Sequence, residues 1–191
     1  MKKINNIPVL LMIFFVSTAG LARDNQKKVD DFTLTDYNGK TYTLSADKDS
    51  KAIVIMFIST RCPVSNSYND RMSALYKDYL PKGVSFIAIN SNSQEDIEEV
   101  KEHAKEHNFP FRVLKDSGNK VADAYDAQVT PEIYVVNQKH ELLYHGRIDN
   151  SRRVDEVESK DLRNALDEIL VGKPVNVAET KAFGCSIKRD E

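Results

Sequence analysis

The sequence has 191 residues, with 27 Lys and Arg against 29 Asp and Glu, and 41% of its residues are apolar. This length suits one domain with a single core and is short for two. A net charge of −2 without a basic block argues against a nucleic-acid partner, and the share of apolar residues excludes a disordered chain. Two cysteines are too few for a disulfide-stapled miniprotein, and the sequence offers no cluster of four ligands for a structural zinc site. We therefore expect one globular domain that holds neither a metal nor a cofactor.

The first 22 residues have the three-part pattern of a secretory signal peptide. Two lysines precede a short apolar run, and the small residues Gly20 and Ala22 stand just before Arg23. The apolar run is shorter than a membrane-spanning helix requires, so an uncleaved anchor is the less favoured alternative. We expect residues 1–22 to be removed and residues 23–191 to be exported, to the periplasm or the medium, without stable membrane insertion. Such a compartment is oxidising and permits thiol chemistry.

The expected elements begin with a hairpin. Residues 31–44 alternate in polarity around Asn38-Gly39, which favours left-handed backbone and predicts a tight turn between two strands. Residues 51–58 and 84–89 are apolar and β-branched, as in strands buried on both faces. The other expected elements are a helix from Pro63 that stops before Pro81, a helix over 93–107 with Ser93 as N-cap, a strand over 111–114, a helix over 120–125, strands over 131–136 and 141–144, and a helix over 160–170. Residues 171–191 are expected to form an irregular tail.

The order of these elements predicts the architecture. Strands that alternate with helices early in the chain favour parallel pairing through right-handed crossovers. The strands over 131–136 and 141–144 are separated by a short turn, so they are expected to pair antiparallel. The result is a three-layer α/β domain over residues 23–191, with a central mixed sheet, helices on both faces and an N-terminal β-hairpin extension.

The residue with the clearest chemical signal is Cys62. It follows a buried strand and precedes Pro63, a residue tolerated in the first turn of a helix. A helix N-terminus offers unpaired N–H groups and the positive end of the dipole, both of which favour a thiolate. Arg61 adds positive charge beside it. We expect a lowered pKa and a reactive thiol at Cys62; a buried, inert cysteine is the alternative.

Five segments carry a family resemblance: Phe32–Lys40 (FTLTDYNGK), Cys62-Pro63, Thr130-Pro131-Glu132, Gly146–Asp149 (GRID) and Gly184–Lys188 (GCSIK). Together they resemble the thioredoxin-like superfamily, and within it the redoxins that include alkyl hydroperoxide reductases and thiol-specific antioxidants, in a peroxiredoxin-like subfamily. The resemblance implies a thioredoxin-like fold with Cys62 as nucleophile. It also implies a cis Pro131 whose loop, with Thr130 alongside, gives backbone hydrogen bonds to an incoming peptide or mixed disulfide. An ordinary trans proline at the start of a strand is the alternative.

The chain departs from both family patterns. Thioredoxins carry Cys-x-x-Cys, whereas Ser65 occupies the fourth position here. Peroxiredoxins carry Pro-x-x-x-Thr/Ser-x-x-Cys; Ser59 matches the hydroxyl, but Ile55 stands in place of the proline. Their peroxide-orienting arginine has no counterpart at the matching position, and Arg61 or Arg147 is the candidate substitute. These departures weaken the interpretation as a peroxidase.

The second cysteine, Cys185, lies in the expected tail. It could be a resolving thiol that attacks Cys62 after oxidation, with a partner reducing the resulting disulfide. It could instead form a permanent structural bridge, or remain a free or intermolecular thiol. A resolving role is favoured narrowly, because Gly184-Cys185 in a mobile tail suits a thiol that moves.

Other polar groups are expected to be structural. His103 and His107 have a helical spacing that can bind zinc, but the third ligand is missing, so both are assigned to a solvated rim. The acidic run over 94–99 is interpreted as a solvated helix start. Arg147 and Asp149 could pair with each other at the surface.

The leading hypothesis is an exported thiol-disulfide oxidoreductase. Cys62 attacks a disulfide or oxidised sulfur of a protein or a small molecule, and Cys185 or an external thiol resolves the intermediate. One alternative is a thiol peroxidase in which peroxide converts Cys62 to sulfenic acid. Another is a non-catalytic binding module with a structural Cys62–Cys185 disulfide.

Overall fold

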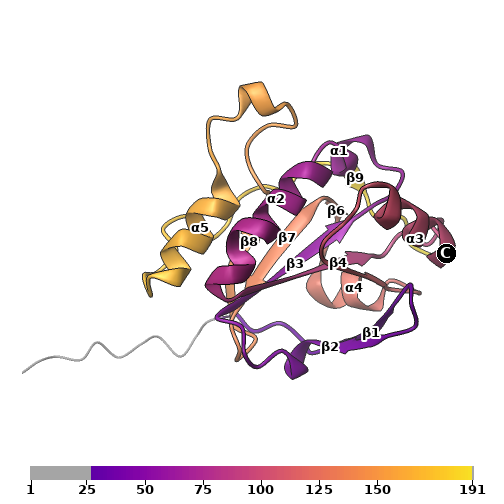
Figure 1. Ribbon diagram of the computed structural model, residues 1–191, viewed down its shortest axis with the longest axis horizontal. Coiled ribbons are helices and arrows are strands. Elements are labelled where there is room, and N and C mark those ends of the chain that lie inside the picture. The colour runs from indigo at the N-terminus through magenta and orange to yellow at the C-terminus, as the bar shows by residue number, and fades with distance from the viewer. Residues whose placement is uncertain (1–26, 191) are drawn as a thin grey trace, which may run out of the picture.

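The computed structural model describes residues 27–190 (Figure 1). The expected signal peptide lies outside the described residues. The strands and helices, in chain order, are β1 (Thr33–Asp36), β2 (Thr41–Thr43), β3 (Ala52–Ile58), α1 (Pro63–Asn66), α2 (Asn69–Tyr79), β4 (Val84–Asn90), α3 (Ile97–Glu106), β5 (Arg112–Lys115), α4 (Lys120–Tyr125), β6 (Val129–Thr130), β7 (Glu132–Val136), β8 (Leu142–Gly146), α5 (Asp161–Leu170) and β9 (Cys185–Ser186). Within these residues no helix is long and apolar enough to cross a bilayer.

Seven strands form one mixed sheet in the order β2-β1-β5-β4-β3-β7-β8. The central strands β3, β4 and β5 are parallel, whereas β7 and β8 add antiparallel strands at one edge and the β1–β2 hairpin adds them at the other. Every residue of β3 is buried, as its continuous apolar sequence predicts. The hairpin turns at Gly39, whose φ of +78° is readily adopted by glycine. The predicted mixed sheet and its parallel centre are confirmed.

Two apolar clusters fill the space between the sheet and its helices. One packs α2, α3 and α5 against one face through residues such as Met72 and Leu162. The other packs α4 against the opposite face, mainly through Val121 and Tyr125. Figure 1 shows α2 and α4 on opposite sides of β3 and β4. The three-layer prediction is therefore confirmed, and the carboxyl end of β3 reaches the edge where Cys62 lies.

Two predicted helix boundaries differ from the structure. The helix after Cys62 is divided into α1 and α2, with a break at residues 67–68. The next helix, α3, begins four residues after Ser93, and its N-cap is Asp96, whose carboxylate accepts a hydrogen bond from the N–H of Glu99. The N–H of Ser93 instead donates to the carbonyl of Lys188. Ser93 is therefore not a cap, because α3 starts only at Ile97 and residues 93–95 form a turn before it.

The C-terminal residues are more ordered than the sequence predicts. The short strand β9 pairs antiparallel with β6, in a two-stranded sheet beside the main one (Figure 1). Ile187 follows β9 and is buried in the cluster around α4, which anchors this segment. The prediction of an irregular tail from residue 171 is wrong for this part of the chain.

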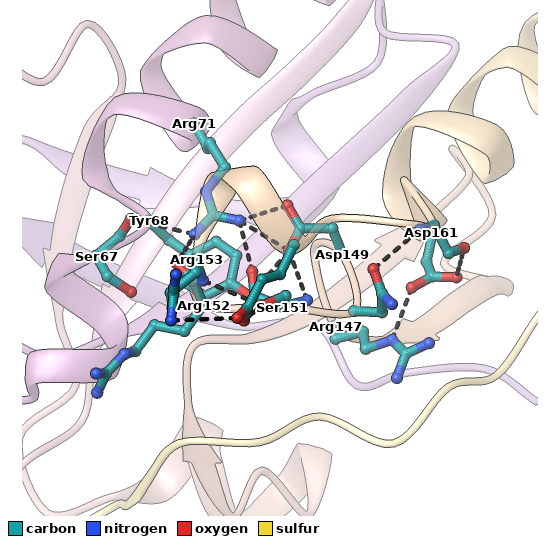
Figure 2. Close-up of polar contacts among 12 residues, drawn as sticks. Ser67, Tyr68, Arg71, Arg147, Asp149, Ser151, Arg152, Arg153 and Asp161 are labelled. Atoms are coloured by element: carbon teal, nitrogen blue, oxygen red, sulfur yellow. Dashed lines mark hydrogen bonds and ion pairs between the residues drawn. The ribbon is translucent and has the colours of Figure 1, made fainter.

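A buried ion pair fixes the loop between β8 and α5 (Figure 2). Arg71 of α2 binds both carboxylate oxygens of Asp149 at 2.8 and 2.7 Å, and it also donates to the carbonyls of Ser151 and Arg152. The Tyr68 hydroxyl donates to the same carboxylate at 2.9 Å. The suggested surface pair of Arg147 with Asp149 is wrong, because Asp149 is buried and Arg147 pairs with Asp161 of α5.

Replacing Asp149 with Ala should destabilise the fold by about 3 kcal/mol, because it leaves the guanidinium of Arg71 partly buried without its counter-charge. Urea unfolding at pH 7 measures this change. The matched control is Asp155→Ala, which removes an exposed ion pair with Arg153 and should change stability by less than about 0.5 kcal/mol. Equal effects of the two substitutions would contradict this account.

Candidate active site

Cys62 is the N-cap residue of α1. Its sulfur accepts a hydrogen bond from the N–H of Ser65 at 3.3 Å, and Pro63 occupies the first turn, where a missing N–H costs nothing. The side chain is buried, with only 3% of Cys62 exposed to solvent. The predicted position at a helix start is confirmed. Since α1 has only four residues, we assign the local effect to this N–H donor rather than to a long helix dipole.

A second wall of the site is the Thr130-Pro131 peptide, which is cis, as the resemblance implied. The Cys62 thiol donates to the Thr130 carbonyl at 3.3 Å. The preceding backbone is held by the buried carboxylate of Glu132, whose Oε2 accepts hydrogen bonds from the N–H groups of Gln128 and Val129 at 2.8 and 3.1 Å. β6 therefore reaches Cys62 in a fixed orientation.

The Glu132 carboxylate also has a side-chain partner. Its Oε1 lies 2.7 Å from Nε2 of His145 on β8. Burial opposes ionisation of Glu132, but His145 and the two backbone N–H donors outweigh it and hold the pKa of this carboxyl below its ordinary value. The Glu132 carboxylate is thus hydrogen-bonded through both of its oxygens and supports the backbone that leads into β6.

The third wall is β9, which carries Cys185. In the β6–β9 register Cys185 lies directly opposite Thr130, whose carbonyl is 3.3 Å from the Cys62 sulfur, and its side chain is close enough to Cys62 to shift the pKa of that thiol. Both cysteines are free thiols. Gly184 makes this approach possible, because a Cβ there would overlap with the Thr130 carbonyl. A resolving role was favoured for Cys185 because it was expected to lie in a mobile tail. The pairing of β9 with β6 instead already holds this thiol beside Cys62.

The two thiols have opposite pKa shifts. Burial raises the pKa of Cys62, but the side chain of Cys185, the Ser65 N–H and the side-chain hydroxyl of Thr130 more than compensate and bring it below the ordinary thiol value. For Cys185, burial and the hydrogen bond to the Cys62 sulfur both raise the pKa. Cys62 is therefore the first of the two thiols to ionise, and Cys185 keeps its proton to higher pH.

A buried acid, Glu95, organises the loop before Cys62. Its carboxylate accepts hydrogen bonds from the Ser59 hydroxyl at 2.5 Å, from the Thr60 N–H at 2.9 Å and from Asn90. The Ser59 oxygen in turn accepts the N–H of Cys62 at 3.0 Å. Burial raises the pKa of Glu95, but these donors lower it by more, so the net shift is downward.

This arrangement corrects one expectation and defines the contacts of Ser59. Glu95 is only 3% exposed and so departs from the solvated helix start expected over 94–99, whereas Asp96 and Glu98 are exposed at the start of α3 as expected. The Ser59 hydroxyl, which matches the hydroxyl position of the peroxiredoxin motif, donates to Glu95 and accepts the N–H of Cys62, so it supports the backbone of its own loop. Glu95 escaped the sequence analysis because it precedes α3 and belongs to no helical period; an acid surrounded by turn residues was the only signal.

The candidate arginines lie elsewhere. The Arg61 guanidinium forms a two-pronged ion pair with Glu99 of α3, and its side chain is 59% exposed. Arg147 is paired with Asp161. Arg61 was assigned to the site because it is next to Cys62 in the sequence. The hydrogen bonds that lower the pKa of Cys62 come from other groups. Ser65, in contrast, does belong to the site: besides its N–H on Cys62, its hydroxyl accepts the N–H of Ser59 at 3.2 Å.

His103 does not lie on a solvated rim. It is buried, near Asn69 at 3.4 Å, and its ring packs against those of His107 and Phe109. Burial lowers its pKa, which favours the neutral ring. Among residues 27–190 no three potential ligands come together in a way that would hold a metal ion.

Residues 26–145 match the AhpC/TSA family. The chain belongs to this family. The match covers the β1–β2 hairpin, Cys62 and Pro131 but ends before the segment that carries Cys185.

Two groups of curated relatives differ in their chemistry. Thiol-disulfide oxidoreductase ResA of a Bacillus cereus strain is 29% identical over 117 residues, which are 61% of this chain and 66% of that protein. Chloroplastic peroxiredoxin Q of Populus jackii is 27% identical over 134 residues, 65% of this chain and 62% of that protein. The chain thus spans just under two thirds of the length of these relatives.

Solved structures resemble the AhpC/TSA chain over more of its length. An uncharacterized conserved protein from Geobacillus kaustophilus is 38% identical with a TM-score of 0.81, covering 86% of this chain and 92% of that one. A hypothetical protein from Sinorhizobium meliloti 1021 is 34% identical with the same TM-score, covering 86% and 94%. The thioredoxin domain of a thiol-disulfide oxidoreductase from Bacteroides vulgatus, with 15% identity and a TM-score of 0.62 over 76% and 96% of the two chains, shares the fold. The thioredoxin-like fold is thereby confirmed.

Replacing Cys185 with Ala should raise the pKa of Cys62, because it removes the hydrogen bond that contributes most to lowering it. Alkylation of Cys62 by iodoacetamide, followed from pH 5 to 10, reports the thiolate fraction, and its pH midpoint should move upward. Cys185→Ser keeps a hydroxyl donor in the same place and should move the midpoint less. An unchanged midpoint in the Ala variant would show that Cys185 does not lower the pKa of Cys62.

Proposed function

We propose that this AhpC/TSA chain is a thiol-disulfide oxidoreductase in which Cys62 is the nucleophile and Cys185 the resolving thiol. The observation that carries the proposal is the position of Cys185, which β9 places opposite Thr130, the residue whose carbonyl lies 3.3 Å from the Cys62 sulfur. The lowered pKa of Cys62 and the raised pKa of Cys185 support the same roles. Thiolates, and not thiols, attack disulfides, so the pair is poised for one direction of attack. Similarity to ResA, named for this activity, supports the same assignment.

The reaction proceeds in two exchanges. The Cys62 thiolate attacks one sulfur of a substrate disulfide, a Cys62–substrate mixed disulfide forms, and the other substrate sulfur leaves as a thiolate that takes up a proton. Cys185 then loses its proton and attacks the Cys62 sulfur, which releases the second substrate thiol. The substrate disulfide is reduced to two thiols while Cys62 and Cys185 are oxidised to a disulfide. A dithiol reductant returns the pair to its starting state.

Peroxide chemistry is less well supported by the same residues. A peroxidase site needs donors aimed at the peroxide oxygens beside the sulfur. Among the described residues the candidate arginines are engaged by Glu99 and Asp161, and the Ser59 hydroxyl is engaged by Glu95. Similarity to peroxiredoxin Q is the observation that favours the alternative.

Cys62→Ser should lower the rate of reduction of hydroxyethyl disulfide by at least about a thousandfold, because it removes the nucleophile. Cys185→Ser should stop turnover at the mixed disulfide, which intact-mass measurement under non-reducing conditions detects on Cys62. Val177→Ala is the control, since Val177 is an exposed tail residue outside the site. Turnover by Cys62→Ser would refute the proposal.

Two further outcomes separate the alternatives. Consumption of hydrogen peroxide by the reduced protein much faster than by free cysteine would assign a peroxidase. A Cys62–Cys185 disulfide that resists millimolar dithiothreitol would assign a structural bridge and a non-catalytic module.

We also propose that the protein is exported, on the basis of the tripartite pattern of residues 1–22. Expression of the full chain in a bacterial host, with N-terminal sequencing of the periplasmic fraction, tests this. A chain that begins at Arg23 is expected. A chain that keeps Met1 and stays with the cytoplasmic fraction would contradict it.

A further inference from the structure

The C-terminal strap, residues 183–190, crosses directly over the reactive sulfur. Within it β9 occupies the backbone edge of β6 (Figure 1). The pairing extends beyond β9 because the N–H of Ile187 donates to the Gln128 carbonyl at 2.9 Å. At its other end the ring of Phe183 packs edge-on against Tyr68, with 6.4 Å between ring centroids. The strap thus closes the side of the site that β6 leaves open.

Anchors beyond β9 hold the strap in place. The N–H of Lys188 donates to the Asn92 side chain at 2.7 Å, and its carbonyl accepts the N–H of Ser93 at 2.9 Å. Arg189 binds Asp123 and the carbonyl of Ala127, both at 2.8 Å. With Ile187 buried as well, the strap is an integral part of the fold rather than a loose end.

Preceding residues fix the strap from the opposite direction. The Thr180 N–H donates to the His145 carbonyl at 2.9 Å, and its hydroxyl lies 2.7 Å from that of Tyr144. Gly146 allows this contact, because a Cβ there would overlap with Thr180. The strap is therefore tied to the sheet on both sides of Cys185.

This placement decides which substrates can approach. An extended polypeptide that brings a disulfide to Cys62 needs main-chain partners beside the sulfur, and a free strand edge is the usual template. The edge next to Cys62 is β6, and Cys185 lies directly opposite Thr130 on it. A polypeptide would have to displace the whole strap, whereas a small disulfide needs only a gap past Cys185, whose side chain is half-buried.

We propose that the strap restricts this oxidoreductase to compact, low-molecular-weight disulfides and excludes disulfides within extended polypeptides. This inference rests on the proposed function and specifies its substrate class. Gly184 is the residue that sets it, because only a residue without a Cβ lets the strap lie against the Thr130 carbonyl. The chemistry is the exchange already described, with a small R–S–S–R as oxidant and two R–SH as products.

The experiment compares two probes with the same leaving group on a Cys185→Ser background, which isolates attack by Cys62. One probe is the 2-thiopyridyl mixed disulfide of 2-mercaptoethanol. The other is the 2-thiopyridyl mixed disulfide of a capped, uncharged Gly/Ser peptide with one central cysteine. Release of 2-thiopyridone gives both second-order rate constants. Each rate constant with the Cys185→Ser chain is divided by the rate constant of the same probe with free cysteine. We expect this ratio to be at least about tenfold larger for the small probe than for the peptide probe.

Two substitutions loosen the strap by different means. Gly184→Ala pushes it from Thr130, and Ile187→Ala removes its buried anchor; in each, the preference for the small probe should fall to about that of free cysteine. The matched control, Val177→Ala, shortens an exposed tail residue outside the strap and should keep the preference. Circular dichroism tests whether each variant is folded. If Gly184→Ala or Ile187→Ala is unfolded, the other variant alone is compared with the intact strap.

The outcomes separate this inference from the proposed function. If Cys62 reacts with neither probe faster than free cysteine, the proposed function fails. If Cys62 reacts rapidly and equally with both probes while the strap is intact, the function stands and the substrate class is wrong. A preference that persists in both loosened variants also overturns the role of the strap.

Discussion

The close approach of β9 to β6 determines the arrangement of the whole site. The two cysteines lie far apart in the sequence, one after a central strand and one near the end of the chain. They meet because Cys185 pairs opposite Thr130, and that pairing is sterically permitted by Gly184. The rest of the fold supplies rigid supports for this meeting: α1 positions one sulfur, and the anchored strap positions the other.

Hydrogen bonds, rather than a neighbouring cation, stabilise charge on Cys62. The Ser65 N–H and the Cys185 thiol act directly on the sulfur, while Arg61 is occupied by Glu99. Two buried carboxylates act one step further away. Glu95 holds the loop on one side of the sulfur and Glu132 holds β6 on the other, each through backbone N–H groups. Such supports keep the donors in place when the thiolate reacts, which is how a site is preorganised.

The sequence predicted the features that depend on local pattern. The buried strand before Cys62, the turn at Gly39 and α4 follow from periodicity, turn chemistry and helix propensity within a short window. Cys62 and Pro131 were found because one stands at a helix start and the other matches a family motif. Neither inference needs a partner distant in the chain.

Several of the failures involve distant partners. Ser93 and Asp96 are both acceptable caps; Asp96 caps α3, while the N–H of Ser93 donates to the carbonyl of Lys188. The helical period places His103 at the edge of the apolar face, but in the structure Asn69 and Phe109 contact its ring and help to bury it. Glu132 has an acid's usual preference for the surface, which is overcome by two N–H donors and His145. Long-range pairing of buried polar groups is decided by the fold and leaves no periodic trace in the sequence.

Placing the second thiol on a strap has a consequence that a Cys-x-x-Cys helix does not share. In such a helix both sulfurs belong to one rigid element, and its oxidation ties nothing else together. Here the fourth position is Ser65, which contributes an N–H donor, and the partner sulfur arrives on β9. On the proposed mechanism, oxidation links the strap covalently to the start of α1, whereas reduction leaves it held by the β6 pairing and its anchors. The same segment then serves as the resolving group and as the boundary of the substrate site, so changes that loosen the strap must alter both properties together.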